Sequence, residues 1–146
     1  MKEKNNIPSF DFEKFQSKFI SNADFTFDNK GGFKIFKIQE VLKYLKFPLP
    51  LHRTNYYDIL FITKGEKSSK HCGLKKYEIF SGDIFFKAAG QVTSGEIYSK
   101  DMEGYFCLMD NDFISSNTNN NILLASFPFF KYGNHPIISV PVSALD

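Results

Sequence analysis

The sequence predicts a mainly β domain, a sandwich or a barrel, and three observations support that prediction. Short segments rich in aromatic and β-branched residues are separated by glycine-containing turns, such as those at 64–66, 81–83 and 89–91. Phenylalanine is unusually common, with 18 copies, and aromatic side chains suit the pleated surface of a sheet. The strands follow one another without the helical segments that βαβ units require, so a parallel sheet is not expected. The 146 residues, 42% of them hydrophobic, fit one domain with one core.

The N-terminal third is expected to hold a short helix, a hairpin and a connector. Three phenylalanines recur at helical spacing within residues 9–20, which favours a helix. Residues 24–38 read as two strands joined by a turn at 30–32, where two glycines follow a lysine. Residues 41–47 form a connector that turns helically and is ended by the prolines that follow it.

The remainder of the chain is expected to be a succession of short strands, of which residues 56–63 give the strongest pattern. A polar loop is expected at 115–121, because its asparagines and serines have no apolar area to bury, and a short packed helix is expected within 122–130. The other expected strands span residues 77–80, 84–88, 92–98, 105–109 and 136–142.

Charge and cysteine content exclude several classes of protein. The net charge of +2 is too weak to indicate a nucleic-acid surface by itself. Cys72 and Cys107 lack the spacing of a metal or redox motif, and reduced thiols are expected. No apolar stretch approaches the roughly 20 residues that span a bilayer, and residues 1–6 are polar, unlike a signal peptide. We therefore expect a cytoplasmic protein with no membrane partner.

Two separated segments carry a resemblance to a known family. The first runs from 52 to 65 and the second from 77 to 93, and they occur in the family's order at compatible spacing. The matching residues are His52, Arg53, Tyr57, Ile59 to Ile62, Thr63, Lys64, Gly65, then Tyr77, Ile79, Gly82, Asp83, Ile84, Phe85, Phe86, Gly90, Gln91 and Val92. They resemble the N-terminal domain of AraC-family (arabinose-regulator-type) bacterial transcription regulators.

The resemblance implies a fold, a domain division and a function. The fold is a cupin-like double-stranded β-helix, a jelly-roll barrel with a few short flanking helices. It divides the chain into a flexible N-terminus (1–8), a sensor domain (9–142) and the start of a linker (143–146). The linker would lead to a helix-turn-helix DNA-binding domain that is absent from this chain. The sensor would bind an unknown small-molecule effector, contact DNA only through that absent domain, and be compatible with a homodimer.

The positions where metal-binding cupins keep their ligands predict that this barrel is metal-free. Such a site needs several imidazoles and a carboxylate. His52 and Asp58 occupy two of the ligand positions, but Thr54 and Thr93 stand where the other two imidazoles belong. One imidazole and one carboxylate cannot complete the site, so we expect no metal, no cofactor and no enzymatic activity.

The same residues predict a ligand-binding end to the barrel. If Asp58 faces inward, strand alternation places Leu60 inward too, and His52 and Thr54 share that phase if the strand extends back without a bulge. Thr93 would line the opposite wall. The candidate ligand-binding residues are therefore His52, Thr54, Asp58, Leu60 and Thr93, a few polar groups in an apolar pocket, which suits a small neutral or polar ligand.

Two other functions are compatible with these residues. A free-standing cupin that binds or isomerises a small sugar-like molecule would use His52 and Asp58 as acid and base, a reading supported by fold analogy alone. A structural dimerisation barrel without ligand would have an interior filled by its own side chains, for example Leu60, Phe85 or Phe86.

Overall fold

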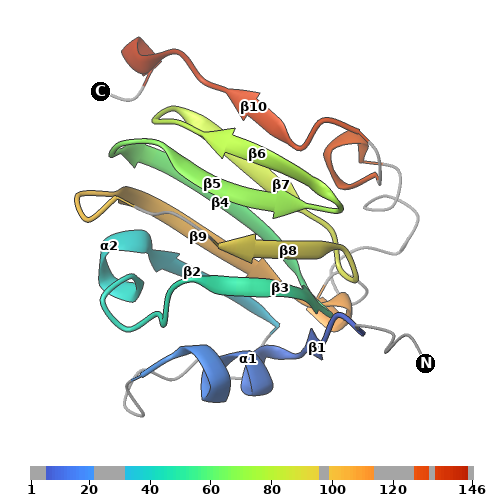
Figure 1. Ribbon diagram of the computed structural model, residues 1–146. Coiled ribbons are helices and arrows are strands. Elements are labelled where there is room, and N and C mark those ends of the chain that lie inside the picture. The colour runs from blue at the N-terminus through green and yellow to red at the C-terminus, as the bar shows by residue number, and fades with distance from the viewer. Residues whose placement is uncertain (1–5, 22–31, 96–98, 114–126, 132–133, 145–146) are drawn as a thin grey trace.

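The protein is mainly β, and its strands form two facing sheets (Figure 1). A computed structural model describes residues 6–21, 32–95, 99–113, 127–131 and 134–144. The first sheet has the order β1 (Ser9–Phe10), β3 (Leu49–Thr54), β8 (Val92–Gly95), β5 (Ser68–Cys72) and β6 (Lys75–Ile79). The second has the order β10 (Ile137–Ser139), β7 (Asp83–Lys87), β4 (Tyr57–Lys64), β9 (Glu103–Met109) and β2 (Phe33–Lys37). Neither sheet closes on itself, so the mainly β prediction is confirmed without a closed jelly-roll barrel.

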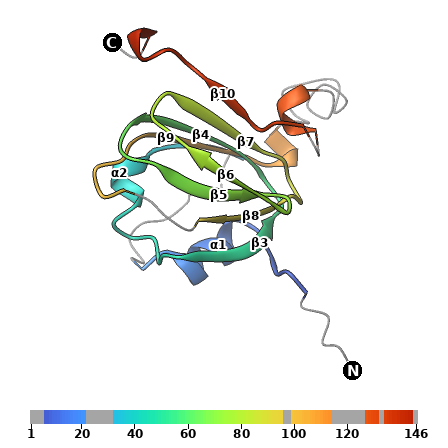
Figure 2. The same ribbon diagram turned by 45° about the horizontal axis from the view of Figure 1, so that its top comes forward.

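The core lies between the two sheets. Figure 2 shows these sheets from a second direction. Leu60 and Phe85 from the second sheet pack in one buried cluster with Cys72 and Ile79 from the first. All pairs within the sheets are antiparallel except that of β1 with β3. Because each sheet buries one face against the other, alternate residues of the central strands β4 and β7 point into this core.

Helix α1 (Phe12–Phe19) packs against strands of both sheets. Asp11 caps it by accepting a hydrogen bond of 2.8 Å from the Lys14 N–H. Phe15 and Phe19 face inward and join a buried cluster with Leu49 from the first sheet and Leu108 from the second. The helix expected within residues 9–20 is thus confirmed. The short α2 (Ile38–Val41) begins earlier than the expected connector at 41–47, and 3-10 turns follow at Pro128–Phe130 and Val142–Ala144.

The strand predicted at 56–63 corresponds to β4, but it does not extend back to His52. The chain bends at residues 55–56, and β3 and β4 lie in different sheets. Strand β5, whose sequence Ser-Ser-Lys-His-Cys is polar, was not predicted either. Ser68, Ser69 and Lys70 are buried despite their polarity, so the hydrophobic pattern gave no signal there. The first strand of the expected hairpin, the loop at 115–121 and most of 122–130 lie outside the described residues.

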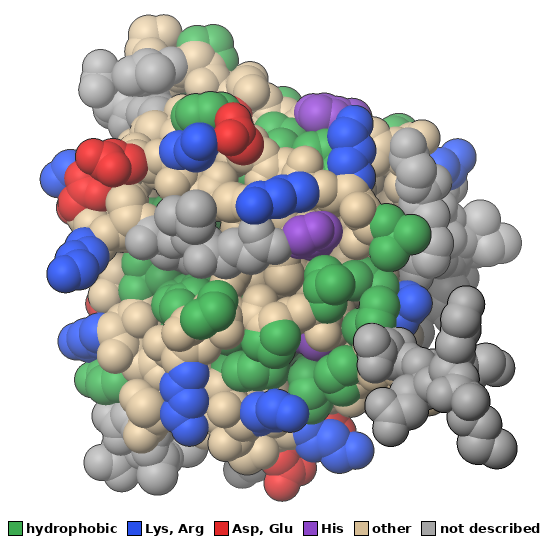
Figure 3. Space-filling model, in the orientation of Figure 1, with side chains coloured by type: hydrophobic (Ala, Val, Ile, Leu, Met, Phe, Trp, Pro, Cys, Tyr) green, Lys and Arg blue, Asp and Glu red, His purple; other side chains and the backbone are tan. Residues whose placement is uncertain are grey.

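Charged side chains are scattered over the outer face of the first sheet (Figure 3), as the small net charge suggested. Exposed apolar side chains also occur on the protein, among them Leu74 in the turn between β5 and β6, which is 89% exposed. None of the described helices is long and apolar enough to cross a bilayer.

Candidate functional site

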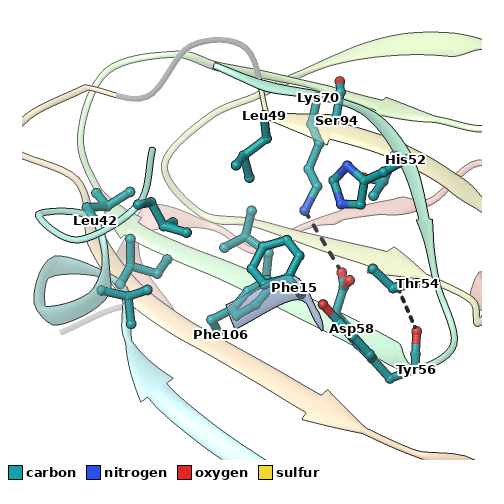
Figure 4. Close-up of a pocket in the computed structure, with 15 residues that line it drawn as sticks. Phe15, Leu42, Leu49, His52, Thr54, Tyr56, Asp58, Lys70, Ser94 and Phe106 are labelled. Carbon is teal, nitrogen blue, oxygen red and sulfur yellow. Dashed lines mark hydrogen bonds and ion pairs between the residues drawn. The ribbon is translucent and has the colours of Figure 1, made fainter. Parts of the chain in front are cut away.

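The five predicted ligand-binding residues all line one cavity between the sheets (Figure 4). His52 and Thr54 reach it from β3, Asp58 and Leu60 from β4, and Thr93 from β8. All five are at most 3% exposed. The inward phase expected for Asp58 and Leu60 is therefore what the structure has, while the bend at residues 55–56 places His52 and Thr54 on the opposite wall.

The cavity is mostly apolar, with its polar groups gathered toward one end. Its volume is about 60 Å³, enough for a few water molecules or a small ligand. Helix α1, helix α2 and the segment that follows α2 supply much of the apolar lining. The apolar lining residues are Phe15, Ile38, Val41, Leu42, Leu45, Leu49, Leu60 and Phe106.

Lys87, a buried lysine that was not among the predicted site residues, forms an ion pair and hydrogen bonds at one side of the cavity. Lys87 is fully buried, and its Nζ lies 3.2 Å from Asp58 Oδ2. The same ammonium donates to Thr54 Oγ1 and, at 3.0 Å, to the carbonyl oxygen of Tyr56. It also lies 5.2 Å from the centre of the Tyr56 ring. Lys87 therefore ties β7 to β4 and to the bend that separates β3 from β4.

Strand alternation could have identified Lys87. In β7, Phe85 and Lys87 are two residues apart and share a face, and the face of Phe85 is the core. A lysine on a core-facing position of a central strand is rare without a partner, which makes it a signal for a buried carboxylate nearby.

A second lysine, Lys70 on β5, extends toward the same carboxylate. Its Nζ lies 4.0 Å from Asp58 Oδ1, with the ring of His52 beside it (Figure 4). The ammonium also lies 5.3 Å from the centre of the Phe85 ring and 5.5 Å from that of Phe106. Aromatic faces attract cations at such distances, so these rings help to hold a charge in an otherwise apolar place.

His52 is a neutral imidazole enclosed by aromatic rings. Its Nδ1 lies 2.7 Å from the carbonyl oxygen of Pro50, which can only accept, so Nδ1 carries the proton and Nε2 is an acceptor. The rings of Phe10, Phe15 and Phe19 lie within 5.8 Å of its centroid. Burial lowers the pKa of His52, and the positive charges of Lys70 and Lys87 lower it further. The imidazole is thus held uncharged at neutral pH.

Burial also shifts the pKa of Lys87 at the site and of Cys72 in the adjacent core. Desolvation lowers the pKa of Lys87, while the neighbouring Asp58 carboxylate opposes the shift. Burial raises the pKa of the Cys72 thiol to about 11, so this free cysteine is protonated and unreactive at neutral pH.

Two buried atoms of the site have no hydrogen-bond partner among the residues that the structure describes. These are Asp58 Oδ1 and Thr93 Oγ1. Lys70 Nζ, at 4.0 Å, forms an ion pair with Asp58 Oδ1 but is beyond hydrogen-bond distance. A buried polar atom left without a partner destabilises a protein by about 1–3 kcal/mol, so a molecule that forms hydrogen bonds with these two atoms would be stabilised in the cavity.

The half-buried His71 lies outside this cavity lining but contacts it through Ser94. Its Nδ1 is 2.9 Å from Ser94 Oγ, and its backbone N–H donates to the same oxygen at 3.1 Å. Ser94 lines the cavity, so this pair of bonds ties β5 to β8 where few ladder bonds join them.

The donor set does not fit a metal ion. Within the described part of the chain, no three His, Cys, Asp or Glu side chains gather where they could hold one. Thr54 and Thr93 supply hydroxyls in place of imidazoles, and the ammonium groups of Lys70 and Lys87 would repel a divalent cation beside Asp58.

The neutral His52 predicts a loss of stability in acid. The unfolded chain takes up a proton near pH 6.5, whereas the folded chain resists it until a lower pH. Because the unfolded state binds more protons in that window, stability falls as the pH drops below about 6.5, by at most about 1.4 kcal/mol per pH unit. Urea unfolding between pH 7.5 and 5 measures this slope.

His52→Gln should flatten that acid slope, and His135→Gln, which alters an exposed imidazole, is the matched control. An unchanged slope in His52→Gln would show that other groups cause the acid sensitivity.

A search of protein-family models finds no match to this chain, and a search of curated proteins finds none either.

Proposed function

We propose that the chain is the effector-sensing and dimerisation domain of an AraC-family transcription regulator. In this proposal the two facing sheets are a metal-free, jelly-roll-like barrel that binds a small molecule. The signal then passes to a helix-turn-helix domain elsewhere in the regulator. The observation that carries the proposal is the pair of unpartnered buried atoms, Asp58 Oδ1 and Thr93 Oγ1, at the polar end of an apolar cavity.

The position of the cavity supports a sensing role. Phe15 of α1 and Val41 of α2 belong to its lining, and both helices lie at the edges of the sheets. A ligand that fills the cavity contacts these helices directly and stabilises one of their arrangements over another. Because a ligand shifts an equilibrium only through different contacts in two states, the helices are the elements through which binding would be transmitted.

A thermal-shift screen of small polar metabolites tests the binding step. A ligand present at about 100 times its dissociation constant stabilises the folded state by about 2.7 kcal/mol, a readily measured rise in Tm. The rise should depend on ligand concentration and shrink in Thr93→Val. A gene whose full product has no helix-turn-helix region would count decisively against the regulatory part of the proposal.

A structural dimerisation domain without a ligand is the second candidate. The small volume of the cavity and the Lys87 network, which already satisfies Asp58 Oδ2 and Thr54, favour it. Phe86 does not block the cavity, because its ring packs on Phe129 and Phe130 in a separate cluster. Ligand binding to the cavity would exclude this candidate.

A free-standing cupin that isomerises a sugar-like molecule is supported least. It needs His52 and Asp58 as acid and base, but Asp58 is salt-bridged to Lys87 and the Nδ1 proton of His52 is held by a backbone carbonyl. Stoichiometric zinc, iron or manganese in the purified protein would revive this candidate.

A further inference from the structure

We propose that the cavity selects a small neutral molecule with a hydroxyl or amide N–H group at one end and an apolar body at the other. This inference rests on the proposed ligand-binding function and narrows it to a class of ligand. The inference rests on the two unpartnered atoms, Asp58 Oδ1 and Thr93 Oγ1, and on the apolar residues that the helices contribute to the cavity lining.

Asp58 Oδ1 sets the direction of the hydrogen bond. The other carboxylate oxygen is bound by Lys87 Nζ at 3.2 Å, and a salt-bridged carboxylate has no proton to donate. Its missing partner must therefore be a donor, an O–H or an N–H. A ketone, an ether or an ester has no such group and would leave this oxygen unsatisfied.

Thr93 Oγ1 adds a second contact from the opposite sheet. Its hydroxyl can donate as well as accept, so it matches the oxygen of an alcohol or the carbonyl of an amide. Asp58 and Thr93 line the same cavity from β4 and β8. A single head group that donates to the carboxylate and accepts from the hydroxyl satisfies both atoms.

The charges at the polar end disfavour a cationic head group, because an amine would bring a third ammonium beside those of Lys70 and Lys87, which already flank Asp58. The two lysines would attract a carboxylate, but a carboxylate has no proton to give Asp58 Oδ1 and would leave that oxygen without a hydrogen bond. A neutral donor avoids both the repulsion and the missing hydrogen bond, and the repulsion is strong in a buried place because little water screens it.

The apolar lining and the volume of the cavity determine the polarity and the size of the ligand's remaining part. Beyond the polar end the lining is aliphatic or aromatic, with Leu42, Leu45 and Leu49 among its residues. Burial of each methylene group against such a wall contributes about 0.8 kcal/mol. The cavity volume of about 60 Å³ limits the body to a stem of a few carbons.

A matched series of four-carbon probes tests the head group. The probes are 1-butanol, butanamide, butanoate and n-butylammonium, titrated into the 146-residue chain and followed by the backbone amide signals in two-dimensional NMR. We expect the alcohol and the amide to shift the signals of Asp58 and Thr93. Their affinity should exceed that of both ions by about tenfold or more, the factor that corresponds to about 1.4 kcal/mol.

Thr93→Val tests whether binding uses the predicted atom. The substitution removes one unpartnered hydroxyl at nearly constant volume, so the unliganded protein should keep or raise its Tm. The affinity for 1-butanol should fall by about fivefold, as expected for the loss of one hydrogen bond. Thr63→Val, at a position outside the cavity lining, is the control and should leave both quantities unchanged.

The outcomes separate this inference from the function on which it rests. If no probe of any charge shifts the cavity signals of the folded protein, ligand binding itself is refuted. If an ion binds as tightly as the alcohol, or if Thr93→Val binds 1-butanol as the wild type does, the cavity binds ligands but the neutral-donor class is wrong.

Discussion

Lys87→Met is expected to lower the free energy of unfolding by about 3–5 kcal/mol, because it removes one partner of a buried ion pair. Lys87 is fully buried, and its Nζ lies 3.2 Å from Asp58 Oδ2. Its loss leaves a buried carboxylate whose Oδ1 already lacks a hydrogen-bond partner. Methionine has a similar length and fills the same space, so the effect is not a cavity effect. Urea denaturation followed by circular dichroism measures it.

Two further variants isolate the cause of that loss. Lys64→Met removes the same kind of pair from the surface, where Lys64 Nζ lies 3.4 Å from Glu103 Oε1 and both side chains are about half exposed. It should change stability by less than about 1 kcal/mol. Lys87→Met combined with Asp58→Leu and Lys70→Met replaces all three buried charges with apolar groups and should regain most of the loss. A triple variant as unstable as Lys87→Met alone would show that the weakened pairing of the carboxylate is not the cause.

Strand alternation predicted the inward face of β4 correctly. Asp58 and Leu60 lie two residues apart in β4 and are both buried, as the period of a strand requires. The same rule failed between Thr54 and Asp58, because a bend at residues 55–56 carries the chain from one sheet to the other. Alternation describes a face only as long as the strand continues, and Asn55, a residue type that favours turns, lies at the break.

Amino-acid composition alone could not show that Lys70 and Lys87 are buried at the site. Lysine is almost never fully buried without a partner, so Lys70 and Lys87 were counted with the solvated surface. Their burial depends on a carboxylate and aromatic rings contributed by other strands. Strand β5, which carries Lys70, is polar along its length and is buried only because its neighbours cover it. Such long-range contacts exist only once the fold is assembled.

Phe85→Ala is the second substitution with a large expected effect, a loss of about 3–5 kcal/mol in the free energy of unfolding. Phe85 is fully buried in β7, directly opposite Leu60 of β4 and Ile137 of β10. It packs in the cluster that joins the two sheets, and its ring lies beneath the ammonium of Lys70. Alanine removes the apolar contacts between the sheets and leaves a void that close-packed neighbours fill only in part.

A graded series distinguishes packing from other causes of that loss. Phe85→Leu keeps most of the buried volume and should destabilise by less than about 1.5 kcal/mol. Phe80→Ala, three residues before the start of β7, alters a ring that is 49% exposed and should have a much smaller effect than Phe85→Ala. If Phe85→Leu were as damaging as Phe85→Ala, the aromatic face beneath Lys70 would be the important feature rather than the filled volume. In that case the attraction between the Lys70 ammonium and the Phe85 ring, worth about 2 kcal/mol or more for a desolvated cation, would explain the loss and would link the core to the binding site.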